Sequence, residues 1–525
     1  MNRTPQRLAA LFLPSLFALG CNRAVEVGAR PDAGIHVTDP RPTKAPLSEW
    51  RGHFPQVIDR EVDLLFLVDN SDSMGDEQAS LAANFPRLVE ALRSPELGND
   101  LPDLRIGVVS SDLGAGAYGL PSCETPGGHG GKLLSAPRLP GCTAPKDHFL
   151  AYERGATNLP VPADDPVEQV KAAFSCIATL GTGGCGFEQS LEAVRRALDP
   201  ALNVNPGFLR KDALLAVVFL TDEDDCSSKD ARLYDPAQQG ISDPLGPLNS
   251  FRCFEFGFRC DVNDRLKAGP RQNCVPDRTW LYPVEEYVEL FKRLKPAGRV
   301  VLAAISGPPD RVEVGRDGSE PMLRPSCAVS KSAAAAPALR LSAVLEGDPT
   351  LRMDSTFHSI CDQDFGPALS RLGRKLVGKL SRQCVAAPLL SASGSLLCAA
   401  GDPIGSASDG RAVTCAASCL EKAECTVEEV LAPGTPSAKA TPIPRCPAPL
   451  FKDPAATCGA SCPCWRLVTS ADPAKRCDPA VDGSPYRLEV VRSAAPVPGA
   501  AVQARCTATR YRWGSRDLAD LTQCD

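Results

Sequence analysis

The chain has 525 residues, of which 43% are hydrophobic and 23% are charged, a composition that is typical of globular domains and excludes a largely disordered protein. Its net charge of −6 gives no electrostatic reason to expect nucleic acid or an anionic membrane surface as a partner. Only five histidines occur and none is close to another in sequence, which argues against a histidine-based metal site.

The first twenty residues have the form of a secretory signal peptide. Arg3 and Arg7 precede an apolar run over 8–19 that is too short to span a bilayer, and Gly20 stands directly before Cys21. A cysteine in this position resembles the lipobox of bacterial lipoproteins, where it is lipidated after cleavage. Ordinary secretion, with Cys21 as one more thiol, is the alternative. The resemblance implies an exported chain with a lipid on Cys21 as its membrane anchor, in the outer membrane, at the periplasmic face or the cell surface.

The cysteine count fits an exported chain. The sequence has 23 cysteines, and setting Cys21 aside leaves 22, an even number that predicts up to eleven disulfides. Cys458, Cys462 and Cys464 are spaced closely enough for a zinc knuckle. Because no histidine or second tight cysteine pair accompanies them, disulfides are the favoured interpretation.

Residues 21–57 are polar and rich in proline, and they predict a tether. From 58 to 382, apolar runs of strand length alternate with helical patterns, which predicts an α/β domain with a mainly parallel sheet between helices. The expected strands are 62–68, 104–110, 213–220 and 299–306, and the expected helices are 81–92, 187–198, 284–294 and 369–380.

Three stretches interrupt this alternation, at about 113–160, 226–280 and 308–355. They are rich in glycine, proline and cysteine, and we expect long surface loops held by disulfides. Residues 384–524 contain twelve cysteines and few long apolar runs. They predict a small cysteine-rich C-terminal domain over 383–525, of β or irregular type, that depends on disulfides for stability.

A group of oxygen-bearing side chains follows the first expected strand of the α/β domain. Asp69, Ser71 and Ser73 form the pattern D-x-S-x-S directly before a helix, and Asp222 follows a later buried strand. In an open α/β sheet, the carboxyl ends of the strands form the edge where ligands bind. Carboxylates and hydroxyls are hard oxygen donors that suit Mg²⁺ or Mn²⁺ better than zinc.

In these residues and in the order of its elements, the chain over 58–382 resembles the von Willebrand factor A (VWA) family, which has a Rossmann-like fold and a metal-ion-dependent adhesion site. The resemblance implies that Asp69, Ser71 and Ser73 hold Mg²⁺, or Mn²⁺ or Ca²⁺, and that Asp222 holds it directly or through water. The family also uses a threonine from a loop. Thr182 is the candidate here, although it stands a few residues earlier than in the family pattern, so Glu188 or a water could take that position instead.

Simpler interpretations exist for parts of this group. A lone D-x-S-x-S could cap the following helix. Metal binding becomes the favoured interpretation because Asp222 follows a later buried strand, in the order that the family pattern requires. Glu223, Asp224 and Asp225 predict a solvated acidic rim rather than further ligands.

The sequence favours a binding module over an enzyme. We find no H-E-x-x-H or G-x-S-x-G motif and no pairing of a free thiol with histidine. The leading hypothesis is an envelope protein whose metal binds an aspartate or glutamate of a partner protein. A metal-dependent hydrolase using Glu223 or Asp224 as base is one alternative, and a metal-free structural lipoprotein is another.

Overall fold

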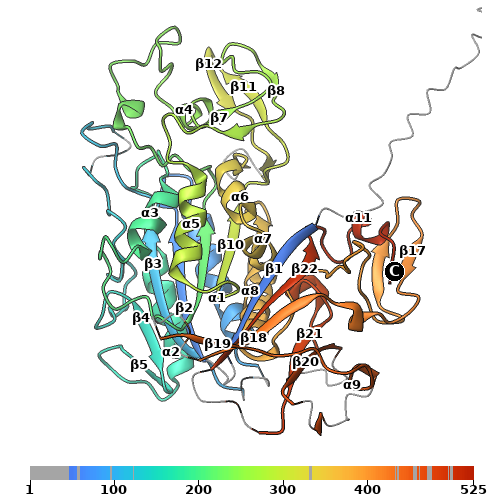
Figure 1. The fold of residues 1–525 in the computed structure, drawn as a ribbon. Helices are drawn as coiled ribbons and strands as arrows, with labels where there is room; N and C mark the ends of the chain where they lie inside the picture. Colours follow the sequence, from blue (N-terminus) through green and yellow to red (C-terminus); the bar gives the residue numbers. More distant parts are fainter. Residues whose placement is uncertain are drawn as a thin grey trace, which may run out of the picture. The chain divides into compact units, whose positions relative to one another are not determined.

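The fold is organised around a seven-stranded mixed sheet with the strand order β15-β10-β6-β2-β3-β4-β5 (Figure 1). The computed structural model describes residues 47–524, except 56–59, 95–96, 98, 122, 124, 330–333, 432, 434–436, 453–457, 460–461, 470–475, 495 and 497–499. The signal peptide and Cys21 lie outside the described residues. The strands are β2 (Glu61–Val68), β3 (Asp103–Ser110), β4 (Leu150–Glu153), β5 (Ala156–Thr157), β6 (Leu214–Leu220), β10 (Val300–Ser306) and β15 (Thr356–Ser359).

The central strands form because their apolar runs can be buried on both faces of the sheet. In β2, Leu64 and Phe66 belong to one hydrophobic core, whereas Leu65 and Leu67 belong to another on the opposite face. β2 pairs in parallel with β3 and β6, β10 pairs in parallel with β6 and β15, and β4 is antiparallel to β3. The prediction of an α/β domain is therefore confirmed in its coarse form, a mixed sheet covered by helices.

Two sets of helices cover the two faces. The first core takes its helical side chains from α1 (Gly75–Leu92), α2 (Pro166–Ala178) and α8 (Gly366–Val377). The second core takes them from α3 (Ser190–Leu198), α5 (Val284–Leu294), α6 (Leu339–Glu346) and α7 (Pro349–Asp354). The helices expected from apolar spacing correspond to α1, α3, α5 and α8.

The strand order creates a natural crevice. Along the chain, β3 follows β2 on one side and β6 then pairs on the other, so the direction of winding reverses between β2 and β6. Ligands of open α/β sheets bind outside the carboxyl ends of strands at such a switch point. Asp69 follows β2 and Asp222 follows β6, so both lie at this edge.

The insertions are held by disulfides as expected, but they contain more regular structure than expected. Cys123–Cys185 and Cys142–Cys176 hold the first insertion, Cys226–Cys253 and Cys260–Cys274 the second, and Cys327–Cys361 the third. The second and third contain α4 (Phe251–Glu255), β7 (Phe258–Arg259), β8 (Gly269–Pro270), β9 (Val275–Pro276), β11 (Glu313–Asp317), β12 (Glu320–Leu323), β13 (Cys327–Ala328) and β14 (Ala334–Ala335). Strand β11 pairs with β8, which joins the two insertions.

The third predicted loop, 308–355, also contains α6 and α7, so its description as a loop is wrong for 339–354. Leu341, Val344 and Leu345 do have helical spacing and are buried in the second core. Alanine and proline residues directly before them obscure this pattern in the sequence.

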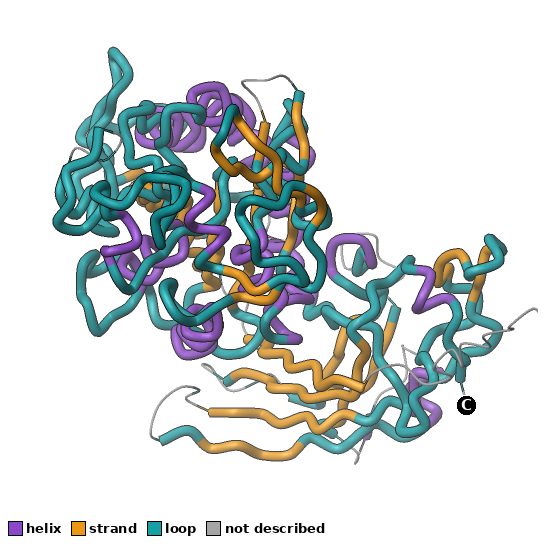
Figure 2. The backbone as a smooth tube through the Cα atoms, turned by 90° about the horizontal axis from the view of Figure 1, so that it is seen from above, coloured by secondary structure: helices purple, strands orange, loops and turns teal. Residues whose placement is uncertain are grey.

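A second sheet, with the order β1-β22-β18-β19, is antiparallel throughout (Figure 2). It consists of β1 (Leu47–Pro55), β22 (Ala501–Thr509), β18 (Cys425–Leu431) and β19 (Lys439–Pro442). The remaining elements are short: η2 (Ala231–Tyr234) in the second insertion, a π-helical turn η3 (Gly378–Arg382), β16 (Pro403–Ser406), β17 (Ala412–Thr414), η4 (Leu420–Lys422), α9 (Ala448–Lys452), β20 (Cys464–Val468), α10 (Pro479–Asp482), β21 (Arg487–Val491) and α11 (Arg516–Ala519).

Strand β1 falls within the predicted tether, 21–57, which is a correction to the sequence analysis. Trp50 and Phe54 lie on one face of β1 and are buried in the core of the C-terminal region. The physical reason is the period-two pattern of these apolar side chains, which fits a strand with one buried face. The C-terminal region is therefore completed by a strand that precedes the α/β domain, and the described residues all belong to one compact unit.

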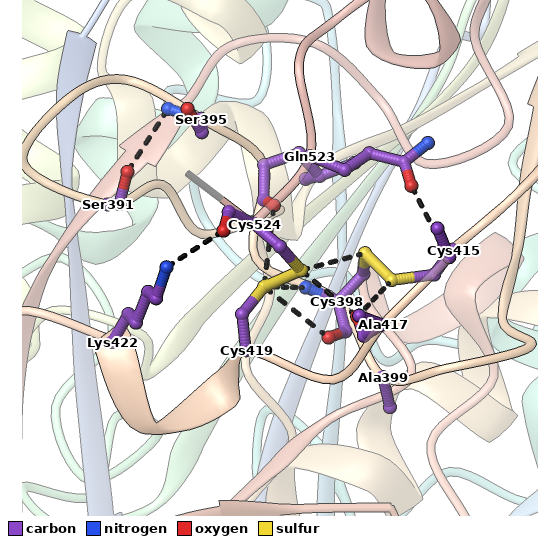
Figure 3. Close-up of a disulfide and its surroundings, with 12 residues drawn as sticks. Ser391, Ser395, Cys398, Ala399, Cys415, Ala417, Cys419, Lys422, Gln523 and Cys524 are labelled. Carbon is purple, nitrogen blue, oxygen red and sulfur yellow. Dashed lines mark hydrogen bonds between the residues drawn. A yellow bond between two sulfur atoms is a disulfide. The ribbon is translucent and has the colours of Figure 1, made fainter.

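The twelve cysteines of 384–524 form six disulfides with one another: Cys384–Cys477, Cys398–Cys415, Cys419–Cys524, Cys425–Cys506, Cys446–Cys464 and Cys458–Cys462. The zinc-knuckle alternative is wrong, because Cys458, Cys462 and Cys464 are all used in disulfides. Figure 3 shows Cys398–Cys415 beside Cys419–Cys524, where Lys422 Nζ also donates to the backbone oxygen of Cys524 at 2.8 Å. Among the described residues, no helix has the length and apolar character needed to cross a membrane.

Candidate metal centre

The turn that follows β2 is fixed to the neighbouring strand. The backbone N–H of Asp69 donates to the carbonyl of Leu220 at 2.9 Å, which ties the end of β2 to the end of β6. The Asp69 carboxylate is fully buried, and its Oδ1 accepts the N–H of Ser71 at 2.9 Å. The turn then leads into α1, so the D-x-S-x-S pattern lies at the carboxyl edge of the sheet as expected.

Two hydroxyls that the sequence analysis did not single out complete the surroundings of Asp69. Ser111 Oγ donates to Asp69 Oδ1 at 3.0 Å, and Thr221 Oγ1 lies 2.8 Å from Asp69 Oδ2 as its donor. Ser111 directly follows β3 and Thr221 directly follows β6. The sequence could have identified them by their positions, because every residue directly after a parallel strand lies at this edge of the sheet.

Ser71, Ser73 and Asp222 continue this network across the crevice. The hydroxyl oxygens of Ser71 and Ser73 are 3.4 Å apart, and the Ser73 hydroxyl is close enough to the Asp222 carboxylate to lower its pKa against the larger effect of burial. Asp222 is buried, with 8% of its surface exposed, and its Oδ1 has no hydrogen-bond partner among the described residues. A buried carboxylate oxygen without a partner is costly and calls for an explanation such as an ion. The structure thus brings together Asp69, Ser71, Ser73 and Asp222.

Two further carboxylates, Glu188 and Glu223, lie in the same cluster and are close enough to affect each other's pKa. Burial is the main cause that raises the pKa of both Glu188 and Glu223. Burial, with the charges of Asp69 and Glu223 added, also raises the pKa of Asp222 to about 8. Among the described residues, no lysine, arginine or histidine forms a salt bridge with Asp69, Glu188, Asp222 or Glu223.

The predicted solvated rim is wrong for Asp224 and Asp225, whereas Glu223 is half-buried and lines a cavity, so the prediction is not contradicted there. Asp224 accepts the backbone N–H groups of Arg340 at 2.9 Å and Leu341 at 3.3 Å, so it caps the start of α6. Asp225 is buried and forms an ion pair with Arg340 Nε at 3.0 Å. These carboxylates serve the packing of α6, which a charge run in the sequence does not reveal.

The loop that contains Thr182 is held against the D-x-S-x-S turn by Gln78 of α1. Gln78 Oε1 accepts the N–H groups of Leu180 at 2.8 Å and Gly181 at 3.0 Å, and its Nε2 donates to the Asp69 carbonyl at 2.8 Å. Thr182 is exposed, and a β-carbon placed on Gly75 would lie 3.6 Å from its Cγ2. The structure therefore places Thr182 beside the start of α1, and its role as a metal ligand stays a prediction.

The centre opens into a cavity of about 970 Å³. Ser71, Ser73 and Asp222 line one side of it, and the second and third insertions line the other with apolar residues such as Phe251 and Phe254 and with the carboxylates Asp317 and Glu320. The cavity is large enough to hold a ligand group, and carboxylates form much of its lining, which favours a cation over an anion as its first occupant.

The oxygen set fits a hard divalent cation. It contains two carboxylates and two hydroxyls of the expected residues, and no sulfur or imidazole ligand reaches it within the described part of the chain. The unpartnered oxygen of Asp222 and the absence of a salt bridge to this cluster among the described residues are the two features that a bound cation would explain.

No protein-family model and no curated protein matches the chain. Among solved structures, the chain is similar to the von Willebrand factor domain of the type V pili tip protein Mfa5 from Porphyromonas gingivalis, at 10% identity and a TM-score of 0.27, over 63% of this chain and 97% of that one. It is also similar to the pilus adhesin SpaC from Lactobacillus rhamnosus GG, at 10% identity and a TM-score of 0.28, over 89% of this chain and 41% of that one.

A third similar structure is proximal thread matrix protein 1 from the mussel byssus, at 11% identity and a TM-score of 0.25, over 65% of this chain and 52% of that one. The chain thus spans about half or less of the length of the byssus protein and of SpaC. TM-scores this low do not establish a common fold.

Proposed function

We propose that the chain is an exported binding protein with a VWA-type domain. Asp69, Ser71, Ser73 and Asp222 would hold Mg²⁺, or Mn²⁺ or Ca²⁺, with Thr182 as a further ligand. The bound cation would supply an open coordination position for a carboxylate of a partner protein. Lipidation of Cys21 would anchor the chain to the outer membrane.

The surroundings of Asp222 give this proposal its main support. The buried Oδ1 of Asp222 has no hydrogen-bond partner, and it lies in a cluster of carboxylates to which the described residues contribute no salt-bridging cation. Burial raises the pKa of Asp222 to about 8, so without a cation this carboxyl is mostly protonated at neutral pH, and a divalent cation would instead stabilise its ionised form. The cavity above it gives a partner side chain access to the same oxygens.

The arrangement favours binding over hydrolysis. A metal-dependent hydrolase needs a base with access to the metal and to substrate. Asp224 accepts backbone N–H groups at the start of α6, so this candidate base already has a structural partner. Glu223 is half-buried and lines the cavity, and Glu223→Gln would test it as a base.

The test is calorimetric titration of Mg²⁺ into the exported chain, with disulfides formed and Cys21→Ser to prevent lipidation. We expect saturable binding that is lost in Asp69→Ala. Asp72→Asn is the matched control, because Asp72 lies in the same turn at an exposed position outside the expected ligand set. This control should bind Mg²⁺ within about threefold of the parent, an effect of the size expected for one exposed charge.

The carboxylate part of the proposal is tested with acetate. In the presence of Mg²⁺, the parent should broaden the methyl NMR signal of acetate, and the Asp69→Ala variant should not. Absence of Mg²⁺ binding in the parent would contradict the metal centre and leave a structural role for the domain. Equal broadening by both proteins would contradict coordination of the carboxylate.

A further inference from the structure

Two disulfides of the C-terminal region, Cys398–Cys415 and Cys419–Cys524, lie in contact with each other (Figure 3). The first closes the segment that contains the hairpin β16–β17, and the second ties the start of η4 to residue 524. The Sγ atoms of Cys398 and Cys524 lie 3.9 Å apart, and the three sulfurs of Cys398, Cys419 and Cys524 are all within 4.8 Å of one another. The Cys398 sulfur is therefore close to both sulfurs of the neighbouring disulfide.

The sulfurs of Cys415 and Cys524 share a further neighbour. Each lies 3.0 Å from the backbone oxygen of Ala417. Cysteines of different disulfides are thus close in two combinations, Cys398 with Cys419 and Cys415 with Cys524. Because thiol–disulfide exchange requires only that a thiolate reaches a disulfide sulfur, this arrangement allows a second pairing of the same four cysteines.

Cys524 is the most accessible of these four cysteines. Cys398, Cys415 and Cys419 are buried, with 0%, 4% and 1% of their surfaces exposed, whereas Cys524 is half-buried. The exposed Lys422 donates from Nζ to the backbone oxygen of Cys524 at 2.8 Å, which places a positive charge next to this cysteine. A positive charge near the point of attack attracts an incoming thiolate.

We propose that the two disulfides form an exchange site for a small thiol, at which Cys398 changes its partner from Cys415 to Cys419. The thiolate of the small thiol attacks Sγ of Cys524, forms a mixed disulfide there and releases Cys419 as a thiolate. Cys419 then attacks Sγ of Cys398 and releases Cys415 as a thiolate. Cys415 attacks the mixed disulfide at Cys524 and releases the small thiolate.

The exchange leaves the number of disulfides unchanged. Each step breaks one disulfide bond and forms another, so the small thiolate is recovered and no oxidant or reductant is consumed. The products are Cys398–Cys419 and Cys415–Cys524. Cys415 directly follows β17, so this end of the hairpin is then tied to Cys524 and no longer to Cys398. A small thiol in the surroundings would thereby change which segment holds the hairpin.

The experiment maps the pairing in the exported full chain that carries Cys21→Ser and Ser418→Lys. Ser418 is exposed and stands between Cys415 and Cys419, so its replacement lets trypsin cut between them. The native pairing then joins peptide 383–411 to 412–418 and peptide 419–422 to 517–525. The proposed pairing joins 383–411 to 419–422 and 412–418 to 517–525. In both pairings, peptide 383–411 also carries 477–487 through Cys384–Cys477.

The chain is incubated with glutathione at pH 8, N-ethylmaleimide then blocks free thiols, and mass spectrometry identifies the joined tryptic peptides. A sample without glutathione gives the starting level of each pair. Cys260–Cys274 is the matched control within the chain, because both of its cysteines are half-buried. Among the described residues, no third cysteine sulfur lies within 4.8 Å of both of its sulfurs, so we expect it to gain no new cysteine partner.

We expect the two joined peptides of the proposed pairing to appear in equal amounts and to exceed their level without glutathione about tenfold. Native pairs alone after incubation would contradict the exchange, and a joined pair of 383–411 with 517–525 would contradict entry at Cys524. New cysteine partners for Cys260 or Cys274 to the same extent would indicate general reshuffling and overturn the site. Fragmentation of the joined peptides assigns the same pairs in the chain that keeps Ser418, so an effect of Ser418→Lys itself is recognised.

Discussion

A buried carboxylate lies at each end of strand β2, Asp63 near its amino end and Asp69 directly after its carboxyl end. The negative charges at the two ends are compensated by different groups. Near its amino end, Asp63 is fully buried and lies 2.8 Å from Arg210 Nε and 3.6 Å from Lys295 Nζ. Directly after its carboxyl end, Asp69 accepts hydrogen bonds only from uncharged groups. Its neighbour across the crevice, Asp222, keeps one oxygen without any partner.

The presence or absence of a basic partner distinguishes a carboxylate that stabilises the fold from one that could bind a ligand. Burying a charge is tolerated when an opposite charge and hydrogen bonds accompany it. At the amino end the protein supplies both cations itself, so Asp63 needs nothing from solution. At the carboxyl end the described residues supply hydroxyls and amides but no salt bridge, so on the proposed function a divalent cation would compensate Asp222.

The largest expected change in stability comes from removing the buried charge of Asp63, near the amino end of β2. Asp63→Asn would leave the buried Lys295 without its counter-charge and Arg210 with only the half-exposed Glu61, and we expect the free energy of unfolding to fall by about 3–5 kcal/mol. Glu61→Gln is the control, because Glu61 is a half-exposed partner of Arg210 at 3.7 Å and its change should cost less than about 1 kcal/mol. Denaturant unfolding measures both, and equal effects would show that Asp63 is not specially compensated.

Removing the carboxylate at the carboxyl end of the sheet should raise the free energy of unfolding instead of lowering it. Without divalent cations at pH 8, Asp222→Asn removes a buried charge that lacks a partner, and we expect the free energy of unfolding to rise by about 1–2 kcal/mol. The same denaturant experiment in EDTA measures it. A loss of stability like that of Asp63→Asn would mean that the chain itself compensates Asp222.

The pH dependence follows from the raised pKa of Asp222, about 8 in the fold against an ordinary value of 3.8. Between these values the folded state binds more protons at this site than the unfolded state does. The contribution of Asp222 to stability without metal is therefore present at low pH and is lost as the pH rises through 8. In EDTA, the stability difference between Asp222→Asn and the parent should grow from pH 5.5 to 8.5, and a difference independent of pH would contradict the raised pKa.

The smallest effect concerns Thr182. Thr182→Val keeps the shape of the side chain and removes its hydroxyl, so a ligand role predicts an Mg²⁺ affinity about tenfold lower, equivalent to about 1.4 kcal/mol. Unfolding without metal should change by less than about 0.5 kcal/mol, because Thr182 is exposed. Unchanged affinity would assign the position to Glu188 or to water.

The sequence predicts those parts of the molecule whose signal is local. Runs such as 62–68 and 213–220 can be buried only as strands of a two-sided sheet, and Asp69 and Asp222 are found because they directly follow such runs. Ser111 and Thr221 follow strands as well, but a lone hydroxyl carries little signal until its distance to Asp69 is known.

Long-range features are harder to predict. Strand β1 has too few apolar residues to stand out, and its partner β22 lies at the other end of the chain. The role of Asp224 and Asp225 depends on Arg340, more than a hundred residues away, so their burial could not be read from the acidic run.

The most direct test of the central claim is the dependence of unfolding on Mg²⁺ concentration. A ligand that binds only the folded state, present at 100 times its Kd, raises the free energy of unfolding by about 2.7 kcal/mol. We predict an increase of this kind for the parent and none for Asp222→Asn, with both proteins measured in the same buffer at pH 8. If Mg²⁺ left the parent unchanged, or stabilised both proteins equally, the carboxyl end of the sheet would not be completed by a divalent cation.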